Sequence, residues 1–161
     1  MTIYVAVCGP DPAGREAAAH SEEIGRLLAR AGAVLVCGGI GGVMESAARG
    51  ASSEGGISIG ILPGQSRAVA NPHITYSIPT GMGEMRNALI VRSADAVIAV
   101  AGEYGTLSEI AFALKTGVPV VGLGTWELSK AGHTVDDPIV RVSSPAEAVA
   151  EALKLSGRTQ R

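Results

Sequence analysis

The stretch GMGEMRNALIVRSADAVIAVAGEYGTLSE, residues 81–109, decides the fold. Its central run, residues 96–101, is short, apolar and rich in Val and Ile, as expected of a strand buried on both faces. Glycines follow at positions 102 and 105, and apolar residues then repeat at helical spacing from Leu107 to Leu114. A strand, a glycine turn and a helix start leave free backbone N–H groups at the positive end of a helix dipole. The stretch therefore predicts a phosphate-binding turn.

Strand-like runs alternate with helical patterns along the rest of the chain. The expected strands cover residues 3–7, 34–36, 57–62, 74–78, 96–101, 118–123 and 139–142, and the expected helices cover a segment around Ile24 to Ala31 and residues 42–50, 83–93, 106–117 and 145–155. This alternation predicts an α/β fold, a Rossmann-like doubly wound, mostly parallel sheet with helices on both faces. The usual strand order places the first strand beside the strand at 96–101, where ligands bind. We interpret residues 1–161 as a single Rossmann-like nucleotide-binding domain.

The charge composition argues against two classes of partner. The chain has 13 Lys and Arg residues against 15 Asp and Glu, and its basic residues are scattered, so no basic stripe is available for a nucleic-acid backbone. No apolar run approaches the roughly 20 residues that a membrane span needs, and Met1 leads straight into the first strand without a signal peptide. We expect a cytoplasmic protein that binds neither nucleic acid nor membrane.

Cysteine and histidine spacing gives no metal-binding pattern. Cys8 and Cys37 end two expected strands, where packed, reduced thiols are the ordinary occupants, although a disulfide or metal site is the alternative. His20, His73 and His133 are far apart and form no ligand pair. We expect no structural metal.

Three glycine turns are expected to meet at the carboxyl edge of the sheet. They follow the strands that end near residues 8, 37 and 101, and sharp strand-to-helix turns need glycine for backbone reasons alone. Three on one edge nevertheless favour a phosphorylated ligand. The residues expected to bind its phosphate are Gly9, Gly38, Gly39, Gly41, Gly42, Gly102, Gly105 and Thr106.

No GxGxxG follows the first strand and no GK[ST] occurs in the turns, which disfavours dinucleotide and nucleoside triphosphate sites. We expect no cofactor.

Two segments carry a family resemblance, CGGIGGVMESAARGA at residues 37–51 and EMRNALIVRSADAVIAVAGEYGTLSEIAFALKTGVPVVGL at residues 84–123. They resemble the LONELY GUY and molybdenum-cofactor carrier superfamily, whose members are often labelled lysine decarboxylases. In the LONELY GUY branch the resemblance implies a Rossmann-like dimer that cleaves cytokinin riboside 5′-monophosphates to free base and ribose 5-phosphate. It implies a homodimer or higher homo-oligomer here.

The LONELY GUY motif PGGxGTxxE falls on residues 101–109, and its upstream arginine falls on Arg86. The chain departs from the pattern at Ala101, at Glu103 and at Asn87, which stands where that branch has a lysine. Glu103 adds a negative charge to the proposed phosphate turn. The segment RNALIVRSAD is more similar to the molybdenum-cofactor carrier side and its bacterial relatives.

Arg86 and Glu109 are the expected catalytic residues. Glu109 could stabilise positive charge on the sugar while an N-glycosidic bond breaks, but the run from Thr106 to Glu109 also matches a helix capping box. Arg86 suits a phosphate or a departing base, with a surface ion pair as the alternative. Thr106 could contact phosphate or only cap its helix.

Two functions remain open from the sequence. The sequence favours hydrolysis of the N-glycosidic bond of a nucleoside 5′-monophosphate, which releases base and ribose 5-phosphate. The alternative is non-catalytic carriage of molybdenum cofactor or a related phosphorylated pterin. A pyridoxal phosphate lysine decarboxylase is excluded, because Lys115, Lys130 and Lys154 lie outside every glycine turn.

Overall fold

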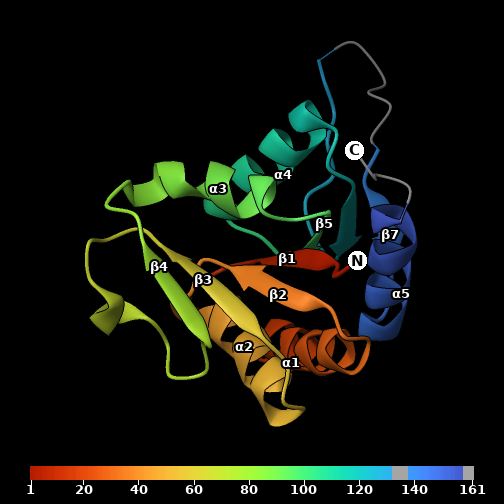
Figure 1. Cartoon of the computed structure of the whole chain (residues 1–161). Helices are drawn as coiled ribbons and strands as arrows, with labels where there is room; N and C mark the ends of the chain where they lie inside the picture. Colours follow the sequence, from red (N-terminus) through yellow and green to blue (C-terminus); the bar gives the residue numbers. More distant parts are fainter. Residues whose placement is uncertain (132–137, 158–161) are drawn as a thin grey trace.

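The computed structural model describes residues 1–131 and 138–157, which form one parallel sheet with helices on both faces (Figure 1). The strands run in the order β4-β3-β2-β1-β5-β6-β7, and every neighbouring pair is parallel. Their bounds are β1 Tyr4–Cys8, β2 Val34–Cys37, β3 Ser58–Leu62, β4 Tyr76–Pro79, β5 Ala96–Val100, β6 Val120–Leu123 and β7 Val140–Val142. The expected Rossmann-like, doubly wound fold is confirmed.

The described residues also form five α-helices and two short 3₁₀ turns. Their bounds are α1 Arg15–Arg30, α2 Gly42–Ser53, α3 Asn87–Arg92, α4 Tyr104–Thr116, α5 Pro145–Ser156, η1 Arg67–Val69 and η2 Gly83–Arg86. Helices α1 and α2 lie on one face of the sheet and α3 and α4 on the other (Figure 1). Among the described residues, no helix has the length and apolar character that crossing a bilayer requires.

Alternate residues of β1 supply the two cores of the protein. Val5 and Val7 pack with α1, α2 and α5, whereas Ala6 and Cys8 pack with α3 and α4. All of these side chains are almost completely buried, which explains why the central strands are continuous apolar runs. The register pairs Cys8 with Ala99, so β1 lies beside β5 as expected, and the chain winds outward from this pair in both directions.

Helix α2 continues beyond its expected end at Gly50. A Cβ atom at Gly50 would lie 1.9 Å from the carbonyl oxygen of Glu22 on α1, and one at Gly25 would lie 2.0 Å from that of Ala47. Both glycines therefore allow the backbones of α1 and α2 to approach closely, and Gly50 does not end its helix.

Helix α4 begins two residues earlier than expected. Glu103 is its N-cap residue, and the Glu103 carbonyl accepts a 3.0 Å hydrogen bond from the Leu107 N–H, which closes the first turn ahead of Thr106. The capping box from Thr106 to Glu109 was therefore a wrong prediction, because Thr106 is already inside the helix. Glu103 makes no side-chain cap. The first turn of α4 consequently has no cap from its own N-cap residue.

The segment expected as a helix over residues 83–93 is split. Its first part is the 3₁₀ turn η2, and only Asn87–Arg92 form the α-helix α3. Gly83 at the start of η2 has a positive φ of 57°, which agrees with a tight turn there.

Candidate functional site

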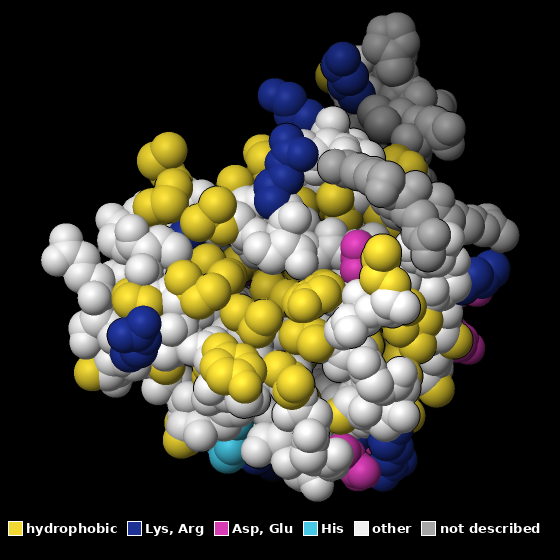
Figure 2. Space-filling view, in the orientation of Figure 1, with side chains coloured by type: hydrophobic (Ala, Val, Ile, Leu, Met, Phe, Trp, Pro, Cys, Tyr) yellow, Lys and Arg dark blue, Asp and Glu magenta, His cyan; other side chains and the backbone are white. Residues whose placement is uncertain are grey.

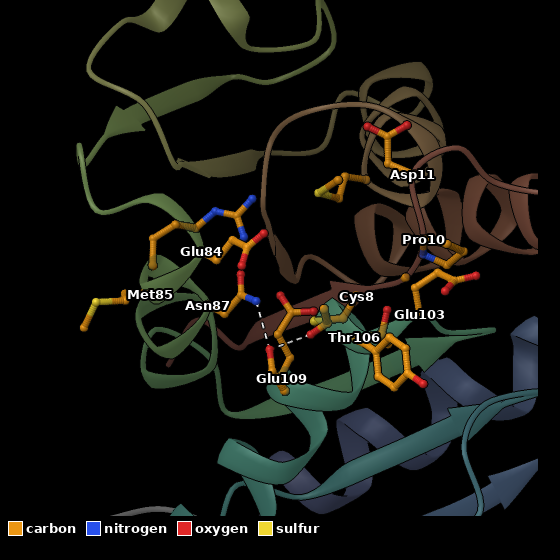
Figure 3. A pocket seen from close by; sticks show the side chains of 15 residues that line it. Cys8, Pro10, Asp11, Glu84, Met85, Asn87, Glu103, Thr106 and Glu109 are labelled. Atoms are coloured by element: carbon orange, nitrogen blue, oxygen red, sulfur yellow. Dashed lines mark hydrogen bonds between the residues drawn. The ribbon is translucent and has the colours of Figure 1, made fainter.

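A cleft of about 610 Å³ opens at the carboxyl edge of the sheet, where β1 and β5 end side by side. The loop after β1, the start of α4 and the segment from η2 to α3 form its walls. The lining residues are Cys8, Gly9, Pro10, Asp11, Met44, Glu84, Met85, Arg86, Asn87, Glu103, Tyr104, Gly105, Thr106, Ser108 and Glu109. Figure 3 shows Cys8, Thr106 and Glu109 near the centre, with Glu84 and Asn87 on one side and Pro10 and Glu103 on the other.

The first turn of α4 presents unused backbone donors to this cleft. Within residues 1–131 and 138–157, the N–H groups of Tyr104, Gly105 and Thr106 have no hydrogen-bond partner. No atom lies within 4 Å of the position that a Cβ of Gly105 would occupy, so the space beside this turn is open. Free amides at the positive end of a helix dipole form an anion-binding site.

Arg86 places a positive charge deep in the same cleft. The residue is only 9% exposed, and its Nε is buried without a hydrogen-bond partner. Its Nη1 donates to Oδ1 of Asn87, and none of the ion pairs formed by the described residues involves Arg86. A buried guanidinium without a carboxylate partner leaves donors available for an anionic ligand.

Glu109 lies at the cleft with its side chain 7% exposed. Burial raises its pKa to about 7, while a hydrogen bond from the Cys8 thiol and the charge of Arg86 act in the opposite direction. The carboxyl group can therefore hold or release a proton near neutral pH. Such a group can donate a hydrogen bond to a ligand or act as a general acid or base.

The two cysteines are buried and free. Burial raises the pKa of Cys8 well above its ordinary value, and the neighbouring Glu109 raises it further. Burial likewise raises the pKa of Cys37 to about 12. Both thiols therefore stay protonated at neutral pH and are unsuited to nucleophilic attack.

Five of the residues expected at the site line this one cleft, namely Gly9, Arg86, Gly105, Thr106 and Glu109. The other five, Gly38, Gly39, Gly41, Gly42 and Gly102, do not line it. A Cβ atom at Gly39 would meet Leu62 at 2.8 Å, and one at Gly102 would meet the Trp126 ring at 2.8 Å. These two glycines thus permit close packing of the chain, and a contact with ligand remains a prediction for them.

Sequence reasoning overlooked Asp11. Its Oδ2 accepts a 3.2 Å hydrogen bond from the Gly41 N–H, and both of its carboxylate oxygens would lie 2.8 Å from a Cβ at Gly41. The only signal in the sequence is an acidic residue placed two positions after the first glycine turn. Its partner is 30 residues away, so the contact could not be read from spacing.

Ser108 was overlooked as well. It accepts a 3.0 Å hydrogen bond from the side-chain amide of Asn87 and donates a 2.7 Å bond to the Gly105 carbonyl. These bonds tie α3 to the first turn of α4, and they fix Asn87, which also accepts from Arg86. Arg86 is thereby linked through side chains to the amide-bearing turn.

The described residues contain no cluster of side chains that could bind a metal ion. No three His, Cys, Asp or Glu side chains lie close enough together to hold a metal ion within the described residues. His133, one of the histidines considered above, lies outside them.

Residues 2–149 match the SLOG cluster4 family, and the chain belongs to that family. An uncharacterized protein of Archaeoglobus fulgidus is 44% identical over 121 residues, which are 75% of this chain and 80% of that protein. The family match includes every residue that lines the cleft.

Two solved structures share the whole fold. The molybdenum cofactor binding protein from the phototrophic bacterium Rippkaea orientalis superposes with a TM-score of 0.86 at 36% identity, covering 96% of each chain. The molybdenum cofactor carrier protein of Chlamydomonas reinhardtii superposes with a TM-score of 0.86 at 31% identity, covering 97% of this chain and 99% of that one. The expected membership of the LONELY GUY and molybdenum-cofactor carrier superfamily is confirmed.

Proposed function

We propose that this protein binds molybdenum cofactor or a related phosphorylated pterin in the cleft and carries it without converting it. The observation that carries the proposal is that one cleft holds both kinds of free donor. The amides of residues 104–106 have no hydrogen-bond partner, and the buried guanidinium of Arg86 has no carboxylate partner. The similarity to proteins named for binding or carrying molybdenum cofactor supports this choice of ligand.

A phosphate monoester suits the α4 end of the cleft. Its oxygens can accept hydrogen bonds from several amides at once, and the helix dipole and Arg86 both favour its negative charge. Charge-assisted bonds of this kind are roughly twice as strong as neutral ones. The rest of the cleft does not suit a second anion, because Asp11 and Glu84 also line it.

The acidic walls suit the other half of a pterin. The aminopyrimidinone ring of a pterin carries neighbouring N–H donors, and carboxylates accept such donors in pairs. Glu109 is the candidate for this contact, since it lines the cleft and is buried there. A cleft of about 610 Å³ also lies within the range of ordinary small-molecule sites.

The alternative function is hydrolysis of a nucleoside 5′-monophosphate to base and ribose 5-phosphate. Its specific support is Glu109, whose pKa of about 7 suits a group that protonates a departing base. Arg86 would then hold the phosphate or the base in the same cleft.

One experiment separates the two functions. The purified protein is incubated with molybdenum cofactor under anaerobic conditions and passed through a desalting column, and bound molybdenum and pterin are quantified. The same preparation is incubated with AMP and N6-substituted AMP, and free base is measured by chromatography. Carriage predicts bound cofactor close to one per chain and no base release. Base release that disappears in Glu109→Gln would instead establish the hydrolase and overturn the carrier proposal.

Arg86 and Arg92 provide a matched pair for the binding measurement. Arg92 is the last residue of α3, which directly follows Arg86. Its guanidinium lies over the Phe112 ring at 5.7 Å from the ring centre, and it does not line the cleft. Arg86→Gln is expected to lose most bound cofactor, whereas Arg92→Gln keeps it. Equal retention by both variants would remove Arg86 from the site.

We also propose that the protein is a homodimer. Figure 2 shows hydrophobic side chains gathered across the middle of one face, and the exposed large apolar residues between the start of β4 and the end of α3 are Tyr76, Ile78, Met82, Met85 and Leu89. Exposed apolar patches of this kind mark interaction surfaces. Sedimentation equilibrium is expected to give a dimer for the wild type and a monomer for Met85→Lys, whose side chain is 76% exposed. A wild-type monomer at high concentration would contradict the proposal.

A further inference from the structure

Asp11 occupies the start of helix α2. The N-cap residue Gly41 has an extended backbone and no side chain to cap the helix. Instead, Oδ2 of Asp11 accepts a hydrogen bond of 3.2 Å from the Gly41 N–H, and the Pro10 carbonyl accepts one of 3.0 Å from the Val43 N–H. The loop after β1 therefore closes over the start of α2 and places a carboxylate there.

The glycine turn before α2 is shaped for this contact. A Cβ at Gly42 would lie 2.2 Å from the Pro10 carbonyl oxygen and 2.7 Å from Cα of Asp11, and Gly42 has a positive φ of 62°. Any side chain at Gly41 would meet the Asp11 carboxylate at 2.8 Å. These glycines thus admit a loop of the same chain, which accounts for their position outside the cleft lining.

The starts of α2 and α4 differ in a way that bears on the ligand. Both helices follow strands of the same parallel sheet and begin at its carboxyl edge. The α4 amides are unpartnered and open to the cleft, which Arg86 also lines. At α2 an anion of the protein itself is already in place, and Asp11 lines the cleft while Gly41 and Gly42 do not.

We infer that Asp11 is a specificity-determining residue, which restricts the cleft to ligands with a single phosphate monoester and rejects those with a diphosphate. This inference rests on the proposed binding of a phosphate at α4. A second phosphate group reaching across the cleft would find the Gly41 amide in use and would face the Asp11 carboxylate. The second phosphate and the Asp11 carboxylate carry like charges, which repel at short range, and solvent screens part of this repulsion because Asp11 is exposed.

The inference concerns which form of a phosphorylated pterin is bound. A pterin with a terminal monophosphate is accepted, and a dinucleotide form, in which the same phosphate is part of a diphosphate, is rejected. The same rule favours nucleoside monophosphates over diphosphates if the protein binds nucleotides.

Calorimetric titrations with inorganic phosphate and with pyrophosphate test this inference in the full chain. The wild type is expected to bind phosphate more tightly than pyrophosphate. Asp11→Asn keeps an oxygen for the Gly41 N–H but removes the charge, and Asp11→Ala frees the Gly41 N–H as well. We expect the ratio of pyrophosphate to phosphate affinity to rise about tenfold in Asp11→Ala, and less in Asp11→Asn.

Glu103→Gln is the matched control, because it removes a carboxylate from the same cleft without opening the start of α2. It should raise both affinities and change their ratio less than Asp11→Ala does. An unchanged ratio in both Asp11 variants, with phosphate still bound, would overturn the inference and leave the proposed function intact. A ratio that rises as much in Glu103→Gln would also overturn it, since general charge would explain the effect. Absence of phosphate binding by the wild type would contradict the proposed function itself.

Discussion

The guanidinium group of Arg86 lies directly against the backbone of Gly38. A Cβ atom at Gly38 would be 2.7 Å from Nη2 and 3.1 Å from Cζ of Arg86, and 2.5 Å from Sδ of Met44. Gly38 does not line the cleft, yet it leaves the room that the buried arginine occupies. The glycine turn after β2 therefore leaves room for the cation of the proposed phosphate site.

Gly38→Ala is expected to displace the Arg86 side chain and weaken phosphate binding. The added methyl group overlaps the guanidinium and Met44, and buried overpacking of this size typically costs about 1–3 kcal/mol. Calorimetry with inorganic phosphate measures the loss, and urea unfolding measures the cost in stability. Gly64→Ala is the control, since no atom lies within 4 Å of its Cβ position. Unchanged phosphate affinity in Gly38→Ala would show that Arg86 does not depend on this glycine.

Glu109→Gln is expected to change how stability depends on pH. The folded state raises the pKa of Glu109 from 4.5 to about 7, so ionisation costs more in the folded than in the unfolded protein. The raised pKa of Glu109 does not affect the free energy of unfolding below pH 4.5, and it lowers that free energy as the pH rises through 7. From 1.36 kcal/mol per unit, the free energy of unfolding of Glu109→Gln relative to wild type should increase by about 3 kcal/mol between pH 4 and pH 8.

Urea unfolding at the two pH values measures this difference. Glu147→Gln is a control of opposite sign, because hydrogen bonds from the backbone and side chain of Ser143 lower the pKa of Glu147. Its carboxylate contributes stability above its unfolded pKa that is lost as pH falls. A Glu109→Gln difference that is constant with pH would mean that Glu109 is ionised normally in the folded protein.

Replacing Glu103, the N-cap residue of α4, by a residue that caps the helix should raise the stability of the protein and weaken phosphate binding. Glu103→Ser supplies a hydroxyl that can accept from the free amides of the first turn, whereas Glu103→Ala removes the same charge without a cap. We expect the Ser variant to be about 1 kcal/mol more stable than the Ala variant and to bind phosphate more weakly. Thermal unfolding and calorimetry on the pair provide the comparison. Equal phosphate affinity in the two would argue that the α4 amides do not contact the anion.

The sheet order could be predicted from the sequence because it depends on local signals. Residues 96–101 are apolar throughout, and only a strand covered on both faces has that composition, so β5 falls at the centre beside β1. The position of Arg86, Gly105 and Glu109 near the end of that pair follows from the same argument. The start of α4 could not be predicted, because Thr106 and Glu109 match a capping box that the backbone at Glu103 overrides.

The contacts that shape the site join distant parts of the chain. Asp11 reaches Gly41, and Gly38 accommodates Arg86, and neither pair has a sequence signal stronger than a glycine. A glycine in the sequence indicates that other atoms can approach the backbone closely there, but it does not indicate which atoms they are. For this reason the sequence favoured ligand contacts for Gly38 and Gly41, where the structure places side chains of the same protein.

The central claim is that the amides of residues 104–106, together with Arg86, hold a phosphate group. An NMR titration of ¹⁵N-labelled wild-type protein with inorganic phosphate tests it most directly. Phosphate binding at these residues predicts saturable shifts of the Tyr104, Gly105 and Thr106 amide signals and of the Arg86 Nε–H signal, with the Gly41 amide unaffected. Shifts at Gly41 without shifts at residues 104–106, or no saturable shift at any of these positions, would contradict it.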